Sequence, residues 1–199
     1  MNIKKTANLL LNFAIKRLAE IFGIMIFAVG VILFLALISY SPEDPNFIFP
    51  DKTKIKNLFG FRGSFVSDLF FQSVGLIAYL ISFTLIITGI NIIRIKEFFL
   101  IIENIFFTII YSLLGTLFLT YFYSKSFFLY INGNGGFIGN YLNQTFLKNI
   151  IQINENLFYL IIILITLILF LISINFNPKN FFTSFKKILN LFFKSDEKN

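Results

Sequence analysis

The sequence predicts an all-α integral membrane protein with four transmembrane helices, two loops on the outer side, and amphipathic interfacial helices at both ends. Hydrophobic residues make up 57% of the 199 residues and charged residues 14%, whereas soluble domains have about 45–50% and 25%. Four apolar stretches are each long enough, as helices, to cross the ~30 Å hydrocarbon core. A chain this short cannot bury so much apolar surface in one water-soluble core.

The first segment, residues 1–18, has the pattern of an amphipathic helix. Lys4, Lys5, Lys16 and Arg17 lie on its polar side. Its apolar residues recur at steps of three and four: Ile3, Ala7, Leu10, Leu11, Ala14, Ile15 and Leu18. Two interpretations stay open: a helix that lies flat on the bilayer surface, or a cytoplasmic tail that only supplies positive charge.

The membrane domain is expected over residues 19–175. Its four spans are predicted at about 21–38, 69–93, 98–122 and 157–174. The first is longer than the apolar core of a signal peptide, and more spans follow, so we expect it to be uncleaved. Gly75 and Gly89 in the second span would let a neighbouring helix approach closely, or at least one of them is a glycine that the lipid environment simply tolerates. The short polar turn at Arg94–Glu97 makes the second and third spans an antiparallel hairpin.

Two polar segments and a basic tail complete the chain. Ser39–Asp68 is a turn-rich loop with three prolines, and Tyr123–Asn156 contains a glycine cluster and a predicted surface helix around residues 141–151. We expect the two loops to fold together as one cap, in which cysteines near Asn57 and Gly136 would crosslink. The tail, residues 176–199, is either a cytoplasmic amphipathic helix bound to the lipid surface or the start of a linker.

The distribution of basic residues predicts the orientation. If the N-terminus is inside, six basic residues lie outside: Lys52, Lys54, Lys56, Arg62, Lys125 and Lys148. Eleven then lie inside: Lys4, Lys5, Lys16, Arg17, Arg94, Lys96, Lys179, Lys186, Lys187, Lys194 and Lys198. The positive-inside rule therefore places both termini in the cytoplasm, in a multi-pass protein of the bacterial inner membrane.

Composition excludes most kinds of active site. The chain has no cysteine and no histidine, which excludes disulfides, thiolate nucleophiles, histidine bases and Cys/His zinc sites. It also contains no phosphate-binding loop and no hydrolase or metalloprotease signature. We therefore predict no catalytic, cofactor-binding or metal site and no enzymatic activity. The net charge of +7 is better explained by anionic lipid than by nucleic acid, because the basic and aromatic residues form no dedicated surface.

Acidic residues give two further alternatives. Glu43, Asp44, Asp51 and Asp68 of the first loop match no known metal-binding spacing, so a solvated turn-rich loop is favoured over a cation site. Glu103 lies near the start of the third span. It is either an intramembrane acid, such as a proton relay, or an interfacial residue that reaches headgroups or pairs with Arg94 or Lys96.

The loop motifs follow a recognisable order around the four spans. Ser41, Pro42, Asp44 and Pro45 follow the first span, and Asn57, Gly60, Gly63 and Asp68 precede the second. Gly75 and Tyr79 lie where the second span was placed, and Gly135, Gly136 and Gly139 lie in the second loop. Together these positions, within about residues 20–175, resemble the N-terminal four-span membrane region of the FtsK/SpoIIIE DNA translocases.

The resemblance implies a function. In that family the membrane region anchors the protein at the division septum and contacts cell-division proteins, and a linker and a hexameric ATPase motor that pumps chromosomal DNA follow. The expected partners are therefore the lipid bilayer, septal membrane proteins and other copies of the chain. No motor sequence is present in these residues, so the chain is expected to be either a fragment of a longer translocase or a stand-alone anchor. The alternative is a small four-span subunit of a solute transporter, with Glu103 as its key residue.

Overall fold

The computed structural model describes residues 3–45 and 54–178, with side chains from residue 8 onward. This part of the chain contains α-helices and no strand, which confirms the all-α class. The helices are α1 (Ile3–Ile38), α2 (Gly60–Val74), α3 (Ile77–Ile95), α4 (Phe99–Phe122), α5 (Gly136–Asn143), α6 (Phe146–Ile153) and α7 (Glu155–Ser173). Asp51 and residues 179–199 of the predicted amphipathic tail lie outside the described residues.

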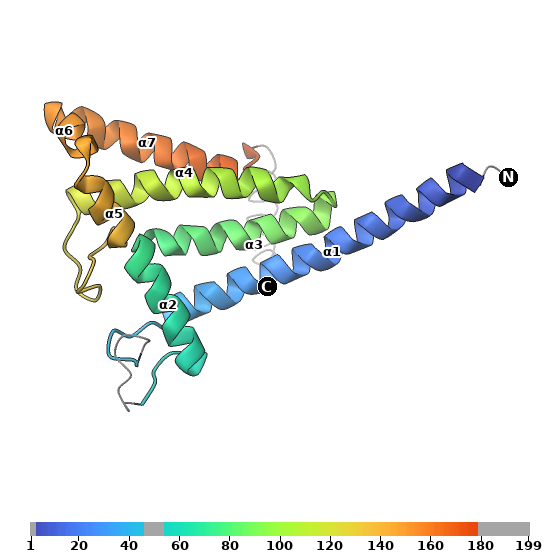
Figure 1. Ribbon diagram of the computed structural model, residues 1–199, viewed down its shortest axis with the longest axis horizontal. Helices are drawn as coiled ribbons and strands as arrows, with labels where there is room; N and C mark the ends of the chain where they lie inside the picture. Colours follow the sequence, from blue (N-terminus) through green and yellow to red (C-terminus); the bar gives the residue numbers. More distant parts are fainter. Residues whose placement is uncertain (1–2, 46–53, 179–199) are drawn as a thin grey trace, which may run out of the picture.

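Four of these helices are long and apolar enough to cross a membrane: α1 from Asn8, α3, α4 and α7. They run side by side in the order α1, α3, α4, α7 (Figure 1), and each packs on the next. The four helices lie roughly lengthwise beside one another. Both long loops lie at one end of the helices, whereas the N-terminus and the α3–α4 turn lie at the opposite end. The structure thus confirms a four-span protein with its two loops on the same side.

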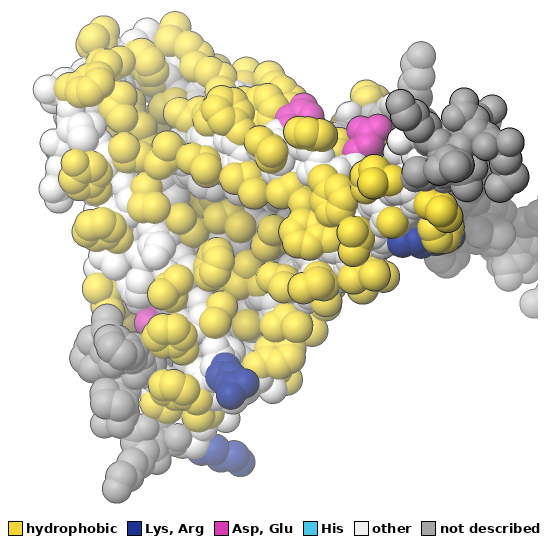
Figure 2. Space-filling model, turned by 45° about the vertical axis from the view of Figure 1, so that its right-hand side comes forward, with side chains coloured by type: hydrophobic (Ala, Val, Ile, Leu, Met, Phe, Trp, Pro, Cys, Tyr) yellow, Lys and Arg dark blue, Asp and Glu magenta, His cyan; other side chains and the backbone are white. Residues whose placement is uncertain are grey.

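The outer surface of the row is apolar. Hydrophobic side chains cover most of the face shown in Figure 2, with few charged side chains among them. On α7, Leu160, Leu164 and Ile168 are each more than half exposed, as is Ile102 on α4. Such a surface would be unstable in water and matches the acyl chains of a bilayer.

The second span begins later than predicted. The apolar stretch 69–93 is divided at Gly75, where the backbone has φ +60°, a conformation that side chains other than glycine rarely adopt. Helix α2 therefore ends at Val74, and its last turn is capped by the Gly75 N–H, which donates to Phe71 O. The helix that spans the membrane is α3, Ile77–Ile95, and residues 60–68 of the predicted loop belong to α2.

The N-terminal segment differs from one of its two interpretations, the separate helix that lies flat on the bilayer surface. Residues 3–18 continue into the first span as one helix, α1, which extends beyond the α3–α4 turn (Figure 1). Because no proline interrupts this segment, its hydrogen-bond ladder continues to Ile38. Side chains from Asn8 to Leu18 are all exposed, and contact with the bundle begins at Ala19.

Small residues allow α1 and α3 to approach closely. A Cβ atom at Gly30 would lie 2.7 Å from Ile86 N, and one at Gly89 would lie 2.7 Å from Phe27 Cα. Both distances are too short, so alanine at either position would force the helices apart. The prediction that Gly89 serves close helix packing is confirmed, whereas Gly75 forms the break between α2 and α3.

Candidate functional site

The Ser-Pro-Glu-Asp-Pro segment closes the first loop around the Asp44 carboxylate. Asp44 N–H donates to Ser41 O (3.1 Å), and this hydrogen bond closes a turn that contains Pro42. The carboxylate then accepts the backbone N–H groups of Lys56 and Asn57, each at 2.8 Å. Asp44 is only 4% exposed. The acid therefore joins the two ends of the first loop, instead of pointing into solvent as predicted.

Asn57 attaches the start of α2 to the end of α1. Its Nδ2 donates to Ala36 O in the last turn of α1 (2.9 Å), and its Oδ1 accepts Phe59 N–H (3.1 Å). Gly60 then turns the chain with φ +62°. A Cβ at Gly63 would collide with Asn57 Oδ1. The space that the Asn57 side chain needs thus explains Gly63 of the Asn-x-x-Gly-x-x-Gly pattern, and the backbone conformation explains Gly60.

Asp68 and Tyr40 form a second polar contact between α2 and the end of α1. Tyr40 Oη donates to Asp68 Oδ1 (3.2 Å), which also accepts Gln72 Nε2 (3.3 Å). Burial, together with the nearby Asp68 carboxylate, raises the pKa of the Tyr40 phenol well above its usual value. Asp68 is itself buried, so the prediction of a solvated acid is wrong here too.

Tyr79 extends this contact into α3. Its hydroxyl donates to Leu37 O (3.4 Å), and its ring lies edge-on to Phe71 at a centroid distance of 5.4 Å. Phe71 and Leu37 are each 1% exposed and belong to the main hydrophobic core. The Tyr79 position therefore connects α1, α2 and α3 beneath the first loop.

The glycines of the second loop seat α5 on α4. The predicted surface helix is in fact two short helices, α5 and α6. A Cβ at Gly135 or at Gly139 would collide with Thr120 Oγ1 and Thr116 O. Glycines four residues apart thus form a flat face that fits against two threonines four residues apart.

The two loops meet at the break between α2 and α3. Leu76 N–H donates to Asn134 O (2.9 Å), and Asn132 Nδ2 donates to Gln72 Oε1 (3.0 Å). Gly136, with φ +67°, passes so close to Ser73 and Gly75 that a side chain would not fit. The prediction of one cap is confirmed. The contact between the loops involves the end of α2, however, whereas Asn57 forms hydrogen bonds with Ala36 of α1 and Phe59 of the first loop.

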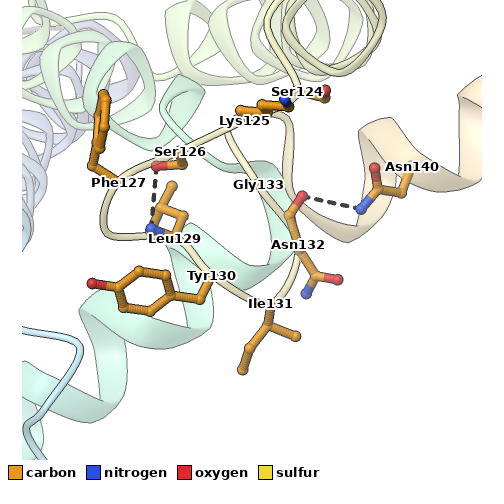
Figure 3. A pocket seen from close by; sticks show the side chains of 10 residues that line it. All are labelled: Ser124, Lys125, Ser126, Phe127, Leu129, Tyr130, Ile131, Asn132, Gly133 and Asn140. Carbon is orange, nitrogen blue, oxygen red and sulfur yellow. Dashed lines mark hydrogen bonds between the residues drawn. The ribbon is translucent and has the colours of Figure 1, made fainter.

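A wide cavity of about 580 Å³ opens in the second loop. Figure 3 shows its lining, which consists of residues 124–127 and 129–133 of the second loop together with Asn140. Polar side chains brace the loop: Asn140 Nδ2 donates to Asn132 O (3.0 Å) and Leu129 N–H to Ser126 Oγ (3.1 Å). Lys125 is the one charged residue in the lining, and this set of side chains offers no acid–base or nucleophilic pair.

The described residues contain no group of three acidic side chains that could hold a metal ion. Glu43 pairs with Lys56 at 2.5 Å on the surface of the first loop. This contact lowers the pKa of Glu43 and raises the pKa of Lys56. The acids Glu43, Asp44 and Asp68 therefore have structural partners in this part of the chain, which gives no support to the alternative of a cation site.

Glu103 lies at the opposite end of the molecule from the cap. Its side chain is exposed on α4, in the second turn of the helix. Lys96, one of its two expected partners, instead forms an ion pair with Glu20 of α1 at 2.6 Å. A role for Glu103 as a relay stays a prediction.

Sequence reasoning missed a polar network inside the bundle. Thr84 of α3 shares a hydrogen bond with Tyr111 of α4 (2.9 Å), and Ser173 of α7 lies 3.4 Å from Thr84. One turn further, Asn104 Nδ2 donates to Thr88 Oγ1 (2.8 Å). The signal was the four-residue spacing of the two threonines in an apolar run, because polar residues inside spans hydrogen-bond to neighbouring helices.

Comparison with known proteins agrees with this arrangement. Residues 15–181 match the family described as the 4TM region of DNA translocase FtsK/SpoIIIE. This chain belongs to that family. The match includes all four spans and both halves of the cap, so the FtsK/SpoIIIE membrane region is the context for every motif described above.

A curated relative gives the same result over a shorter stretch. The DNA translocase FtsK of Azospirillum brasilense is 38% identical over 72 residues, which is 35% of this chain and 11% of the relative. The chain thus matches only a small part of that longer protein. No solved structure matches the chain. What the family assignment establishes is a multi-pass membrane region of FtsK type, which is distinct from a motor domain.

Proposed function

We propose that this chain anchors an FtsK-type translocase in the bacterial inner membrane and gathers at the division septum, where its cap contacts other membrane proteins of the division machinery. The cap carries the proposal. In the described chain, the cap is where the loop motifs that resemble the family come together. It lies at one end of four helices whose outer surface otherwise faces lipid. Contacts made there would leave the spans free to stay in the bilayer.

The orientation follows from charge. In the sequence, six basic residues fall in the two loops and eleven in the terminal segments and the α3–α4 turn, so the positive-inside rule directs the cap away from the cytoplasm. Lys96 and Arg17 both pair with Glu20 at the opposite end. A motor that follows the fourth span would then lie in the cytoplasm, on the side where chromosomal DNA is found.

A fluorescent fusion of residues 1–199 in dividing cells of its own host tests the proposal. The wild-type fusion should be enriched at the septum. Gly139→Leu should remove that enrichment, because leucine cannot fit between α5 and Thr116 and Thr120, yet the fusion should stay in the membrane. The control is Tyr141→Leu on the exposed side of the same helix, which should behave as wild type. Uniform distribution of the wild-type fusion would contradict septal targeting.

A further inference from the structure

An apolar cavity of about 570 Å³ lies between α1, α2 and α3 near the cap end of these helices, and it is distinct from the cavity in Figure 3. Helix α2 crosses the end of α1 here (Figure 1). The buried Leu33 and Ala36 of α1 form the floor of the cavity together with Leu85 of α3, whereas Val29 and Ile32 on its rim are half exposed or more. The cavity is therefore closed toward the core and open toward the lipid-facing surface of α1.

Helix α2 places polar side chains inward and apolar side chains outward. Ser64 and Ser67 are buried, whereas Phe61, Val66 and Leu69 are 49%, 37% and 50% exposed. A surface helix that faces water has the opposite pattern. The outward face of α2 includes Val66, which forms part of the cavity wall. This face is therefore suited to lipid, as in a helix that lies at the membrane interface.

Arg62 of α2 brings a positive charge to the wall of this cavity. Among the described residues that line the cavity, no aspartate or glutamate accompanies it. Arg62 is exposed, and it takes part in none of the three ion pairs that the described residues form. Arg62 and Val66 are one helical turn apart, so the charged residue lies beside the apolar wall. A guanidinium binds phosphate through two parallel hydrogen bonds. The cavity thus combines apolar walls with a group that recognises phosphate.

We propose that this cavity binds one phospholipid with a net negative headgroup, from the leaflet on the cap side. One acyl chain lies between α1 and α2, and the phosphate binds Arg62. A zwitterionic headgroup would bring an ammonium group close to the guanidinium, and an apolar helix of another protein would leave the arginine without an anion. An anionic lipid matches both the apolar walls and the charge. The inference goes beyond the anchoring role and needs only that the spans lie in a bilayer.

Quenching of a single tryptophan by brominated lipid measures this binding in the full chain. The chain has no tryptophan, so Phe59→Trp in the cavity wall and Leu160→Trp on the exposed face of α7 each give one reporter. Each protein is reconstituted in phosphatidylcholine vesicles with increasing brominated phosphatidylglycerol. We expect the affinity relative to phosphatidylcholine to be about fivefold higher at Phe59→Trp than at Leu160→Trp, the effect of one basic side chain near an anionic lipid. Equal affinities at the two reporters would overturn the proposal, as would equal quenching of Phe59→Trp by brominated phosphatidylethanolamine.

Charge variants of the Phe59→Trp protein test the phosphate contact. Arg62→Gln should lower the relative affinity for phosphatidylglycerol about fivefold, whereas Arg62→Lys should retain most of it. The control is Lys125→Gln, which removes a basic residue of the second loop that lies outside the lining and should leave the affinity unchanged. An unchanged affinity in Arg62→Gln would overturn the proposal.

Size variants of the same protein test the acyl-chain contact. Val66→Phe adds bulk to the cavity wall and should lower the affinity to that of the Leu160→Trp reporter. The matched control is Leu69→Phe, at an exposed position of α2 that lies outside the described lining. Both substitutions are at exposed positions, so the pair decides even if Arg62→Gln does not fold. Equal affinities for the two variants would refute the cavity as the site.

Dilution in lipid separates a bound lipid from a second copy of the chain. If a helix of another copy fills the cavity, brominated lipid should quench Phe59→Trp less than Leu160→Trp, and the quenching should increase as the protein is diluted in lipid. That result would overturn the proposal. The experiment uses purified protein and no cell. Failure to prefer phosphatidylglycerol would therefore leave the septal anchor intact, and a uniformly distributed fusion would leave the lipid site intact.

Discussion

The contact between Asn57 and Gly63 gives a quantitative test of how the cap is built. Asn57→Ala removes hydrogen bonds to Ala36 O and Phe59 N–H from a side chain that is 5% exposed. Each net hydrogen bond contributes about 1 kcal/mol, and buried partners left unpaired add to the cost. We expect a loss of about 2–4 kcal/mol in the free energy of unfolding.

Gly63→Ala should also destabilise the wild type, because its methyl group collides with Asn57 Oδ1. Overpacking of this kind costs about 1–3 kcal/mol, offset in part by the better helix propensity of alanine. In the Asn57→Ala background the collision with Oδ1 is absent, although Phe59 Cβ would still be 2.7 Å away. The double variant should therefore be about 1–2 kcal/mol more stable than additivity predicts.

The wild type, the two single variants and the double variant form a double-mutant cycle. Equilibrium unfolding in mixed detergent measures the free energy of unfolding of each protein. Gly115→Ala serves as the control glycine, because it meets the Ile77 side chain in another part of the bundle and should be additive with Asn57→Ala. If Asn57→Ala and Gly63→Ala are additive within error, the motif spacing does not arise from this contact and the explanation above is wrong.

Three further predictions test other parts of the structure. Cysteines at Gln72 and Asn132, whose side chains are hydrogen-bonded, should crosslink within one chain; if they never do, the two loops are not joined. Glu103→Gln should leave membrane insertion and septal enrichment unchanged, since the side chain is exposed, whereas loss of a solute-transport activity would favour the transporter alternative. Lys56 lowers the pKa of Glu43 below 4.5. The wild type should therefore be thermally more stable than Glu43→Gln at pH 7, and this difference should disappear as the pH falls through the lowered pKa. An undiminished difference at pH 3 would contradict this.

The sequence was sufficient for the overall architecture. Apolar runs revealed four spans because lipid requires about 20 consecutive apolar residues, and the polar turn at Arg94–Glu97 gave the hairpin of α3 and α4. The order of the loop motifs was enough to indicate the family. These features depend on local composition, which a single sequence contains.

Features that depend on contacts between distant segments were not predictable. The run 69–93 is apolar on both sides of Gly75, so composition could not show that two helices share it. At this break Leu76 N–H donates to the carbonyl oxygen of Asn134, which belongs to the other loop. Asp44 and Asp68 were expected in solvent because acids are rarely buried, yet here backbone N–H groups and the Tyr40 hydroxyl take the place of water.

The central claim is that the cap lies outside the cytoplasm, and cysteine labelling in intact cells tests it most directly. Because the chain has no cysteine, single variants Leu58→Cys, Lys125→Cys and Glu97→Cys give clean labelling sites at exposed positions. A membrane-impermeant thiol reagent should label the cysteines at positions 58 and 125 in intact cells, and the one at position 97 only after the membrane is permeabilised. Labelling of position 97 in intact cells, or protection of either loop position, would contradict a cap held outside the cytoplasm.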